Sequence, residues 1–209
     1  PRGQAQRLGM RQRLRRWQSV AGQVAVVRDP DVNARVALGP VPDYEFAGGS
    51  GTVEMFLYQT STAANNPCFF AGRDDSQSPA VRYSMHAGAN GAQLWIWNGA
   101  TALSVATSVS MLNNLVHVAY VYNAGSLTVY FNGAPLTTWN IPLGSGTGRP
   151  FQIGASGPAN QEAWPGRIDE VAIYAEALPA AAVAAWYSCA CDVEPSVLAT
   201  RISPSGMRS

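Results

Sequence analysis

Residues 116–133 read VHVAYVYNAGSLTVYFNG and carry the clearest structural signal in the chain. Apolar side chains recur at every second position on both sides of the short turn at residues 123–126, which predicts two antiparallel strands joined as a hairpin. Asn132 and Gly133 predict a second turn, because both residue types tolerate positive φ, and residues 135–141 should return as a third strand. One face of this meander is apolar and needs a second sheet to cover it, so the segment predicts a β-sandwich.

The same signals recur along the chain. Alternation predicts a strand at residues 52–60, where both faces are apolar enough for a central strand covered on both sides. Further strands, separated by turn signals at the spacing of a sandwich, are expected at residues 20–27, 34–38, 68–71, 81–85, 93–97, 103–109, 151–154 and 166–174. Residues 180–187 form the one strong helix signal in the body of the chain, with Pro179 near its start.

The composition agrees with a turn-rich β protein. The 209 residues include 20 Gly and 14 Pro, and only 13% of them are charged. Three Cys is an odd number, so we expect free, partly buried thiols rather than a disulfide framework. No apolar run approaches the ~20 residues that a membrane helix needs, and the apolar segment 20–27 is interrupted by Gly22 and Gln23, so we expect neither a membrane partner nor a signal peptide.

Charge divides the chain unevenly. Residues 1–27 contain six Arg and no acidic residue, whereas eight Arg face thirteen acidic residues in the remainder. We therefore divide the chain into an Arg-rich arm at residues 1–18, a sandwich domain at residues 19–190 and an extended tail at residues 191–209. The arm is either a short amphipathic helix or a solvated tail.

The arm is also the candidate anchor to other molecules. Arginine suits protein interfaces, because its planar guanidinium pairs with carboxylates. Phosphates would also attract it, but no base-reading motif accompanies the arginines, so we expect protein subunits and not nucleic acid as partners. The anchoring residues predicted on this basis are Arg7, Arg11, Arg13, Arg15, Arg16 and Trp17.

Several segments resemble one known family. Residues 117–119 (HVA), 127–133 (LTVYFNG) and 151–154 (FQIG) resemble the core hairpin of laminin-G-like, concanavalin-A-like jelly rolls. The most specific segment, residues 164–174 (WPGRIDEVAIY) followed by Ala-Leu at 177–178, is similar to the ending of that family, and residues 43–46 and 52–54 resemble an early strand pair.

The resemblance extends over about residues 40–187 and departs from the family at two places. Leu115 stands where the family often has Trp, and the first strand of the family is not obvious between residues 18 and 40. The resemblance implies an all-β fold: a two-sheet antiparallel jelly-roll sandwich with a short C-terminal helix, here with extended termini. It also implies binding of glycans or protein surfaces, although the fold alone does not settle function.

The sequence predicts that the protein is not an enzyme. Related jelly-roll glycanases carry a Glu-x-Asp-x-x-Glu motif on one strand, and that spacing is absent here. Asp169 and Glu170 are adjacent on a predicted strand, so they should alternate faces and cannot both act on one glycosidic bond. We expect Asp169 to bond to backbone and Glu170 to be solvated. His117 is expected to be a half-buried structural residue of the sheet.

Two sets of residues are candidates for ligand binding. Trp95 and Trp97 share one face of a predicted strand and, with Trp139, could stack on sugar rings, although a role in the core or at a subunit interface is the alternative for Trp95 and Trp97. Trp164 matches a family position that packs inside the sandwich. The resemblance implies calcium as the ion to consider, because it is the usual ion of the family. The candidate ligands are Asp74, Asp75 and Asn90, and the alternative is that these loop residues are only solvated.

These observations lead to one expected function and two alternatives. The expected function is that of a non-enzymatic binding module on the surface of a bacteriophage virion, as a capsid decoration or tail accessory protein within a homo-oligomeric assembly, presenting a lectin-like face to glycans or cell surfaces. The first alternative is a free or secreted lectin-like protein. The second is a glycan hydrolase, which would require a carboxylate cluster that the sequence does not display.

Overall fold

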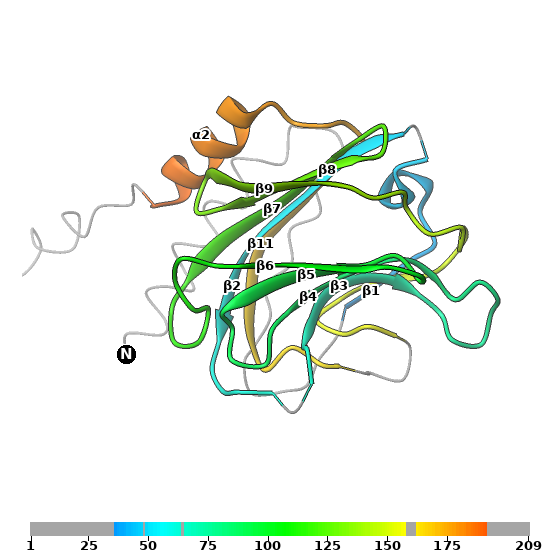
Figure 1. Ribbon diagram of the computed structural model, residues 1–209, viewed down its shortest axis with the longest axis horizontal. Coiled ribbons are helices and arrows are strands. Elements are labelled where there is room, and N and C mark those ends of the chain that lie inside the picture. The colour runs from blue at the N-terminus through cyan, green and yellow to red at the C-terminus, as the bar shows by residue number, and fades with distance from the viewer. Residues whose placement is uncertain (1–35, 48, 64, 158–161, 192–209) are drawn as a thin grey trace, which may run out of the picture.

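The computed structural model describes residues 36–47, 49–63, 65–157 and 162–191, and it confirms the two-sheet sandwich with a short C-terminal helix (Figure 1). A six-stranded sheet lies below a five-stranded sheet in this view, and the helix lies above the five-stranded sheet. Every pairing between neighbouring strands is antiparallel. The described part of the chain is therefore a three-layer arrangement of helix, sheet and sheet.

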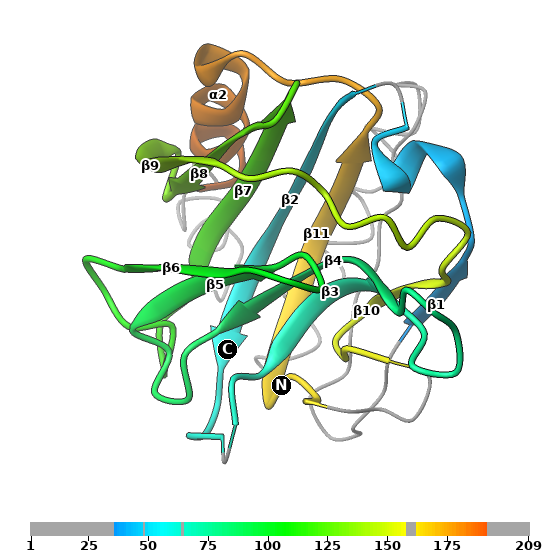
Figure 2. The same ribbon diagram turned by 45° about the vertical axis from the view of Figure 1, so that its right-hand side comes forward.

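The order of strands differs from the order of the sequence in both sheets (Figure 2). The six-stranded sheet runs β1 (Val36–Gly39), β10 (Phe151–Ile153), β3 (Cys68–Arg73), β4 (Val81–Ala87), β5 (Gln93–Trp97) and β6 (Ala102–Ala106). The five-stranded sheet runs β11 (Gly166–Tyr174), β2 (Ser50–Gln59), β7 (Val116–Asn123), β8 (Ser126–Phe131) and β9 (Ala134–Asn140). A 3-10 turn, η1 (Pro42–Glu45), connects β1 to β2, and α2 (Ala180–Cys191) follows β11.

The turns of the β7–β8–β9 meander are built as the sequence predicts. Ala124 and Gly125 have φ of 47° and 90°, and Asn132 and Gly133 have φ of 50° and 77°. Positive φ at both central residues is the backbone geometry that matches the right-handed twist of the flanking strands. At Gly133 the helix adds a second requirement, because a Cβ atom there would lie 2.8 Å from Cδ1 of Tyr187.

The core lies between the two sheets and is rich in aromatic rings. Trp164 is 1% exposed and meets Phe69 edge to face, with 5.9 Å between ring centroids, so its predicted place inside the sandwich is confirmed. Tyr83 stacks on Phe46 at 5.2 Å. Each such buried side chain contributes on the order of 1.5–3 kcal/mol to folding.

Two phenolic hydroxyls in the core are satisfied by backbone carbonyls. The Tyr83 hydroxyl donates to the carbonyl oxygen of Tyr44 at 2.6 Å, and the Tyr120 hydroxyl donates to that of Trp95 at 3.2 Å. Burial raises the pKa of both tyrosines well above 10, because the charged phenolate would lose its hydration. The second bond reaches from β7 to β5 and so joins the two sheets through the core.

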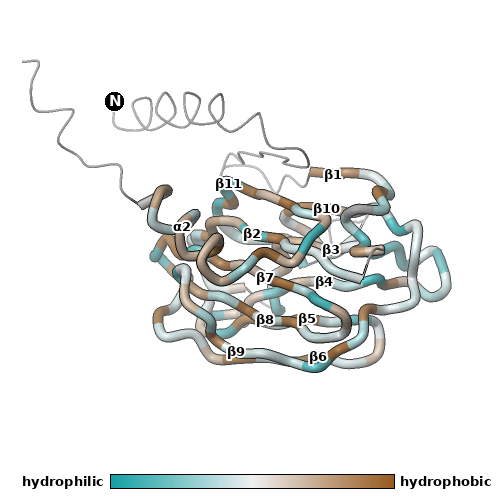
Figure 3. Tube along the Cα trace, turned by 90° about the horizontal axis from the view of Figure 1, so that it is seen from above, coloured by the Kyte–Doolittle hydropathy of each residue, from teal (hydrophilic) through white to brown (hydrophobic). Residues whose placement is uncertain are grey.

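Helix α2 covers the outer face of the five-stranded sheet (Figures 1 and 3). Val183 is fully buried and packs with Ala119, Val121 and Tyr130. The prediction that residues 52–60 form a central strand covered on both sides is therefore confirmed. One face of β2 meets the core between the sheets, and the other lies under the helix.

The helix also explains why His117 is more buried than expected. We predicted a half-buried side chain, but His117 is 0% exposed, because its ring lies against Trp186 and Tyr187 of α2 at centroid distances of 5.2 and 5.8 Å. Its Nε2 lies 3.5 Å from Oε2 of Glu54, which is equally buried. The Tyr174 hydroxyl donates to the other Glu54 oxygen at 2.9 Å, whereas Glu54 Oε2 and both ring nitrogens of His117 make no hydrogen bond with the described residues.

The strand predicted at residues 166–174 is present, but it is irregular at the acidic pair that we expected to alternate between its faces. A β-bulge interrupts the pairing of β11 with β2 between Asp169 and Ala172, and Glu170 has a φ of 51°. The Asp169 carboxylate accepts a hydrogen bond from the Glu170 backbone N–H at 2.9 Å, which confirms its expected bond to backbone. Glu170 is half-buried rather than solvated.

Several predictions fall on residues that the structure does not describe. The anchoring residues (Arg7, Arg11, Arg13, Arg15, Arg16 and Trp17), the strand expected at residues 20–27 and the tail from residue 192 lie outside the described ranges. Within the described ranges, Cys68 and Cys189 are free thiols, the first buried and the second exposed. No helix in the same ranges has the length and apolar character required to cross a bilayer.

The packing of α2 leads to a test of what holds the helix on the sheet. Trp186 contacts Phe56 and His117 at ring-centroid distances of 5.4 and 5.2 Å, so Trp186→Ala should lower the free energy of unfolding by about 2 kcal/mol. Urea denaturation measures the loss, and amide exchange should show α2 opening before the sheets. Ser188→Ala, at an exposed position of the same helix, is the control. Equal stability of both variants would contradict the docking described here.

Candidate functional site

The outer face of the six-stranded sheet carries the residues that the core does not use. Along β5, Leu94 and Ile96 are buried in the core. Trp95 and Trp97, which alternate with them, point to the opposite face and are half-buried. On the neighbouring strand β4, His86 lies opposite Trp95 and Ser84 lies opposite Trp97. No described helix covers this face (Figure 2).

A pocket of about 330 Å³ opens at this face. Its lining comes from four neighbouring strands and two loops: Asn66, Arg73, His86, Trp95, Ile96, Trp97, Ala102 and Glu162. The volume is at the lower end of the range of small-molecule sites, about 300–1,000 Å³. The pocket thus combines the faces of two indole rings with a few polar groups.

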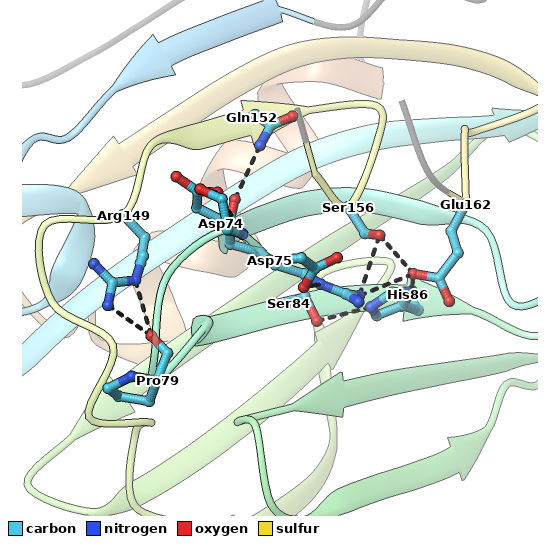
Figure 4. A network of polar contacts seen from close by, with 11 residues as sticks. Asp74, Asp75, Pro79, Ser84, His86, Arg149, Gln152, Ser156 and Glu162 are labelled. Atoms are coloured by element: carbon cyan, nitrogen blue, oxygen red, sulfur yellow. Dashed lines mark hydrogen bonds and ion pairs between the residues drawn. The ribbon is translucent and has the colours of Figure 1, made fainter. Parts of the chain in front are cut away.

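Figure 4 shows the network of polar contacts to which the polar groups of the pocket belong. Arg73 donates from Nε to Oδ1 of Asp75 at 2.8 Å, and its Nη1 lies 3.4 Å from Oε2 of Glu162. The Ser156 hydroxyl donates to the same Glu162 oxygen at 2.6 Å. One guanidinium is therefore shared by two carboxylates, of which Glu162 lines the pocket and Asp75 does not.

The hydrogen bonds of His86 determine its tautomer. Its Nδ1 lies 3.1 Å from the carbonyl oxygen of Asn66, and its Nε2 lies 2.8 Å from the Ser84 hydroxyl. Because a carbonyl only accepts, Nδ1 carries the proton and Nε2 accepts from Ser84. Burial lowers the pKa of His86 below the ordinary 6.5, an effect that the Glu162 carboxylate 4.0 Å away partly opposes. The imidazole is consequently neutral at pH 7.

The arrangement is better suited to binding than to hydrolysis. Ser84 donates to His86 as a serine nucleophile donates to its base, but Ser84 is 0% exposed and lies on a strand paired on both sides. Glycoside hydrolysis needs one carboxyl group to release a proton and another to attack or to activate water. Here Asp75 and Glu162 are both held by the Arg73 guanidinium.

The structure brings together two of the three predicted sugar-binding tryptophans. Trp95 and Trp97 line the pocket, and the alternative of a place in the core is wrong, because the inward positions of β5 belong to Leu94 and Ile96. The alternative of a subunit interface stays a prediction. Trp139 lies on β9, the edge strand of the other sheet, and packs partly buried against the core. It is not part of the pocket lining.

The three predicted calcium ligands are not brought together. Asp74 and Asp75 lie in the loop before β4, and Asn90 lies in the turn after it, at the other end of a seven-residue strand that spans about 20 Å. Asp74 accepts hydrogen bonds from Ser76 and Gln77, Asp75 pairs with Arg73, and Asn90 Oδ1 accepts from the backbone of Ala92. Within the described ranges, no group of three or more His, Cys, Asp or Glu could hold a metal ion.

Sequence reasoning missed the polar half of the pocket. The alternation of Ser84 with His86, in the strand before the two tryptophans, was a usable signal, because adjacent strands place same-face residues side by side. Arg73 and Glu162 gave no such signal. They are distant in the sequence, and they meet only because the loop before β11 returns to lie beside β3, where Ala163 bridges to Cys68.

The lowered pKa of His86 predicts a dependence of stability on pH. The folded state disfavours the proton, so below about pH 6.5 the unfolded state binds more protons and the free energy of unfolding falls as the pH drops, by up to about 1.4 kcal/mol per unit. His86→Gln removes this contribution, so its stability should fall less between pH 7 and pH 5.5 than that of the wild type. Urea titrations at both pH values measure the difference. Identical slopes would show that His86 is not the responsible group.

Several solved structures are similar to this chain in fold. A heptameric SAP-like pentraxin from Limulus polyphemus aligns with a TM-score of 0.57 and 21% identity over 74% of this chain and 75% of its own. A Trypanosoma rangeli sialidase aligns with a TM-score of 0.58 and 17% identity, and the chain spans 28% of that sialidase. The binding domain of Paraclostridial Mosquitocidal Protein 1 aligns with a TM-score of 0.58 and 13% identity over 47% of its length.

At these identities the solved structures establish a shared fold. A comparison with curated protein sequences finds no match. The family model of the concanavalin A-like lectin/glucanases superfamily, of the laminin G type, matches residues 31–184. That range contains both sheets and every residue that lines the pocket. The chain belongs to the concanavalin A-like lectin/glucanase superfamily.

Proposed function

We propose that the protein is a non-enzymatic, lectin-like module that binds carbohydrate in the pocket on the outer face of the six-stranded sheet. The observation that carries this proposal is the placement of Trp95 and Trp97 beside the Arg73–Glu162 ion pair in a pocket of about 330 Å³. Aromatic faces and fixed polar groups are the two elements that sugar recognition requires, and here they share one cavity.

The two kinds of group have separate tasks. A pyranose ring has an apolar face of C–H bonds, which packs against an indole ring, and Trp95 and Trp97 are about 6.7 Å apart along the strand. The hydroxyl groups at the edge of the ring need both donors and acceptors. Arg73 can donate to them and Glu162 can accept from them, and their ion pair holds both side chains in place before a ligand arrives.

The family supports this proposal, because it is a superfamily of lectins and glucanases. Two of the similar solved structures point in the same direction, since one is a domain named for binding and another belongs to a sialidase, a protein that acts on sugars. These relations favour glycans as the ligand class. The choice of pocket comes from this chain's own residues.

The proposal predicts which tryptophans matter. Trp95→Ala and Trp97→Ala should each weaken glycan binding at least about tenfold, or about 1.4 kcal/mol, because each removes a stacking surface. A glycan array would identify the ligand, and isothermal titration would give the affinities. Trp139→Ala, which removes a half-buried tryptophan from β9, should bind as the wild type does. Unchanged binding in both pocket variants would refute the assignment of the site.

A second proposal concerns the partners and location of the protein. We propose that the Arg-rich arm docks the domain onto other protein subunits of a homo-oligomeric particle, with a bacteriophage capsid or tail as the particle and the virion surface as the location; a free extracellular lectin is the alternative. The supporting observation is the cluster of six Arg without an acidic residue in residues 1–27. The Limulus pentraxin, which has a similar fold, is itself heptameric.

Self-association of the purified chain tests the second proposal. Sedimentation velocity should show a multimer for the full chain. A variant in which Arg7, Arg11, Arg13, Arg15 and Arg16 are changed to Gln should dissociate, because it loses the charges that would pair with carboxylates of neighbouring subunits. Arg167→Gln, an exposed position on β11, controls for general loss of charge. A monomeric wild-type chain would favour the free lectin.

A further inference from the structure

The charges around the pocket are not balanced. Arg73 and Glu162 line the pocket, and Arg73 also pairs with a second carboxylate, Asp75, which lies outside the lining. His86 adds no charge at pH 7, because burial keeps its imidazole neutral. The local charge is therefore negative by about one unit, although the chain as a whole has a net charge of +1.

The single cation is already engaged. Arg73 donates from Nε to Asp75, and its Nη1 approaches both Ser156 and Glu162 at 3.4 Å. A carboxylate or sulfate group of a ligand would have to displace one of these partners to reach Nε or Nη1. A hydroxyl group can donate to the carboxylate and accept from the guanidinium at once, so it can insert beside the ion pair without adding a charge.

Glu162 is directed toward hydroxyl donors. Its Oε2 accepts from Ser156 and approaches Arg73, whereas its Oε1 has no hydrogen-bond partner among the described residues. A carboxylate oxygen with open lone pairs needs a donor, and the hydroxyls of a sugar supply one. An anion placed beside this carboxylate would meet electrostatic repulsion, which is stronger at a partly buried protein surface than in bulk water.

From these charges we propose that the pocket selects uncharged glycans, built from hexoses or N-acetylhexosamines, and discriminates against sialylated, uronic-acid and sulfated sugars. The inference rests on the proposed carbohydrate binding and adds the class of ligand. In the bound state one sugar ring stacks on Trp95 or Trp97. Its hydroxyls donate to Glu162 and accept from Arg73, so the two side chains of the ion pair together recognise a pair of sugar hydroxyls.

Matched glycan pairs test the selectivity. N-acetyllactosamine is compared with its sialylated form, and a neutral gluco-oligosaccharide is compared with an oligogalacturonate of the same length, using isothermal titration with the full chain. In the pair whose neutral glycan binds more tightly, we expect that neutral glycan to bind at least tenfold more tightly than its anionic counterpart. Because salt screens exposed charges, this ratio should shrink between 50 mM and 500 mM NaCl.

Two variants separate the pocket charge from the overall charge. Glu162→Gln keeps the shape of the side chain but removes the repelling carboxylate, so the ratio between neutral and anionic ligands should fall severalfold. Asp74→Asn removes one negative charge from the neighbouring loop, outside the pocket lining, and should leave the ratio unchanged. Thermal unfolding of both variants checks that they are folded. The salt dependence of the wild-type affinity ratio tests independently whether charge causes the selectivity.

The possible outcomes distinguish this inference from the proposed function. Anionic glycans that bind as tightly as neutral ones, or more tightly, would overturn the selectivity while leaving carbohydrate binding in place. A ratio unaffected by both salt and Glu162→Gln would also overturn it, because the discrimination would then not come from charge. If no member of any pair bound, the proposed function itself would fail, and this inference with it.

Discussion

The alternation of side chains along each strand, combined with the burial of one face of each sheet, is the constraint on which the rest of the structure depends. Once Leu94 and Ile96 are placed in the core, Trp95 and Trp97 have to point the other way. A one-residue change of register would exchange the two sets and bury the pocket. The hydrogen bond from Tyr120 to the carbonyl of Trp95 spans the core and opposes such a slip. The register that places Leu94 and Ile96 in the core thus also places Trp95 and Trp97 at the pocket.

Sequence reasoning could predict what depends on local pattern. It gave both turns of the β7–β8–β9 meander and the shared face of Trp95 and Trp97, because these follow from period-two alternation and from residues that tolerate positive φ. It failed where distant segments meet. The burial of His117 depends on contacts with a helix about 70 residues later in the chain. The ion pair between Arg73 and Glu162 likewise depends on the return of a loop.

The buried Glu54–His117 pair contrasts with the exposed ion pair of the pocket. Glu54 and His117 are both fully excluded from solvent beneath α2, where polar groups cost free energy unless they are paired. Such a pair adds little net stability, but removal of one partner would leave the other without compensation. Polar groups at this interface therefore favour a single position of the helix over sliding along an otherwise apolar surface. Arg73 and Glu162, by contrast, remain accessible and available to a ligand.

The helix on the outer side of the five-stranded sheet also gives the domain a front and a back. With α2 occupying one broad side, the open side of the six-stranded sheet holds the indole platform. On the proposed carbohydrate binding, a cavity of about 330 Å³ would hold a single sugar ring, and strong adhesion would come from several copies engaging one glycan-coated surface at once. A domain with two different broad sides suits such an arrangement, since copies joined through the side that carries α2 would leave every pocket facing the same direction.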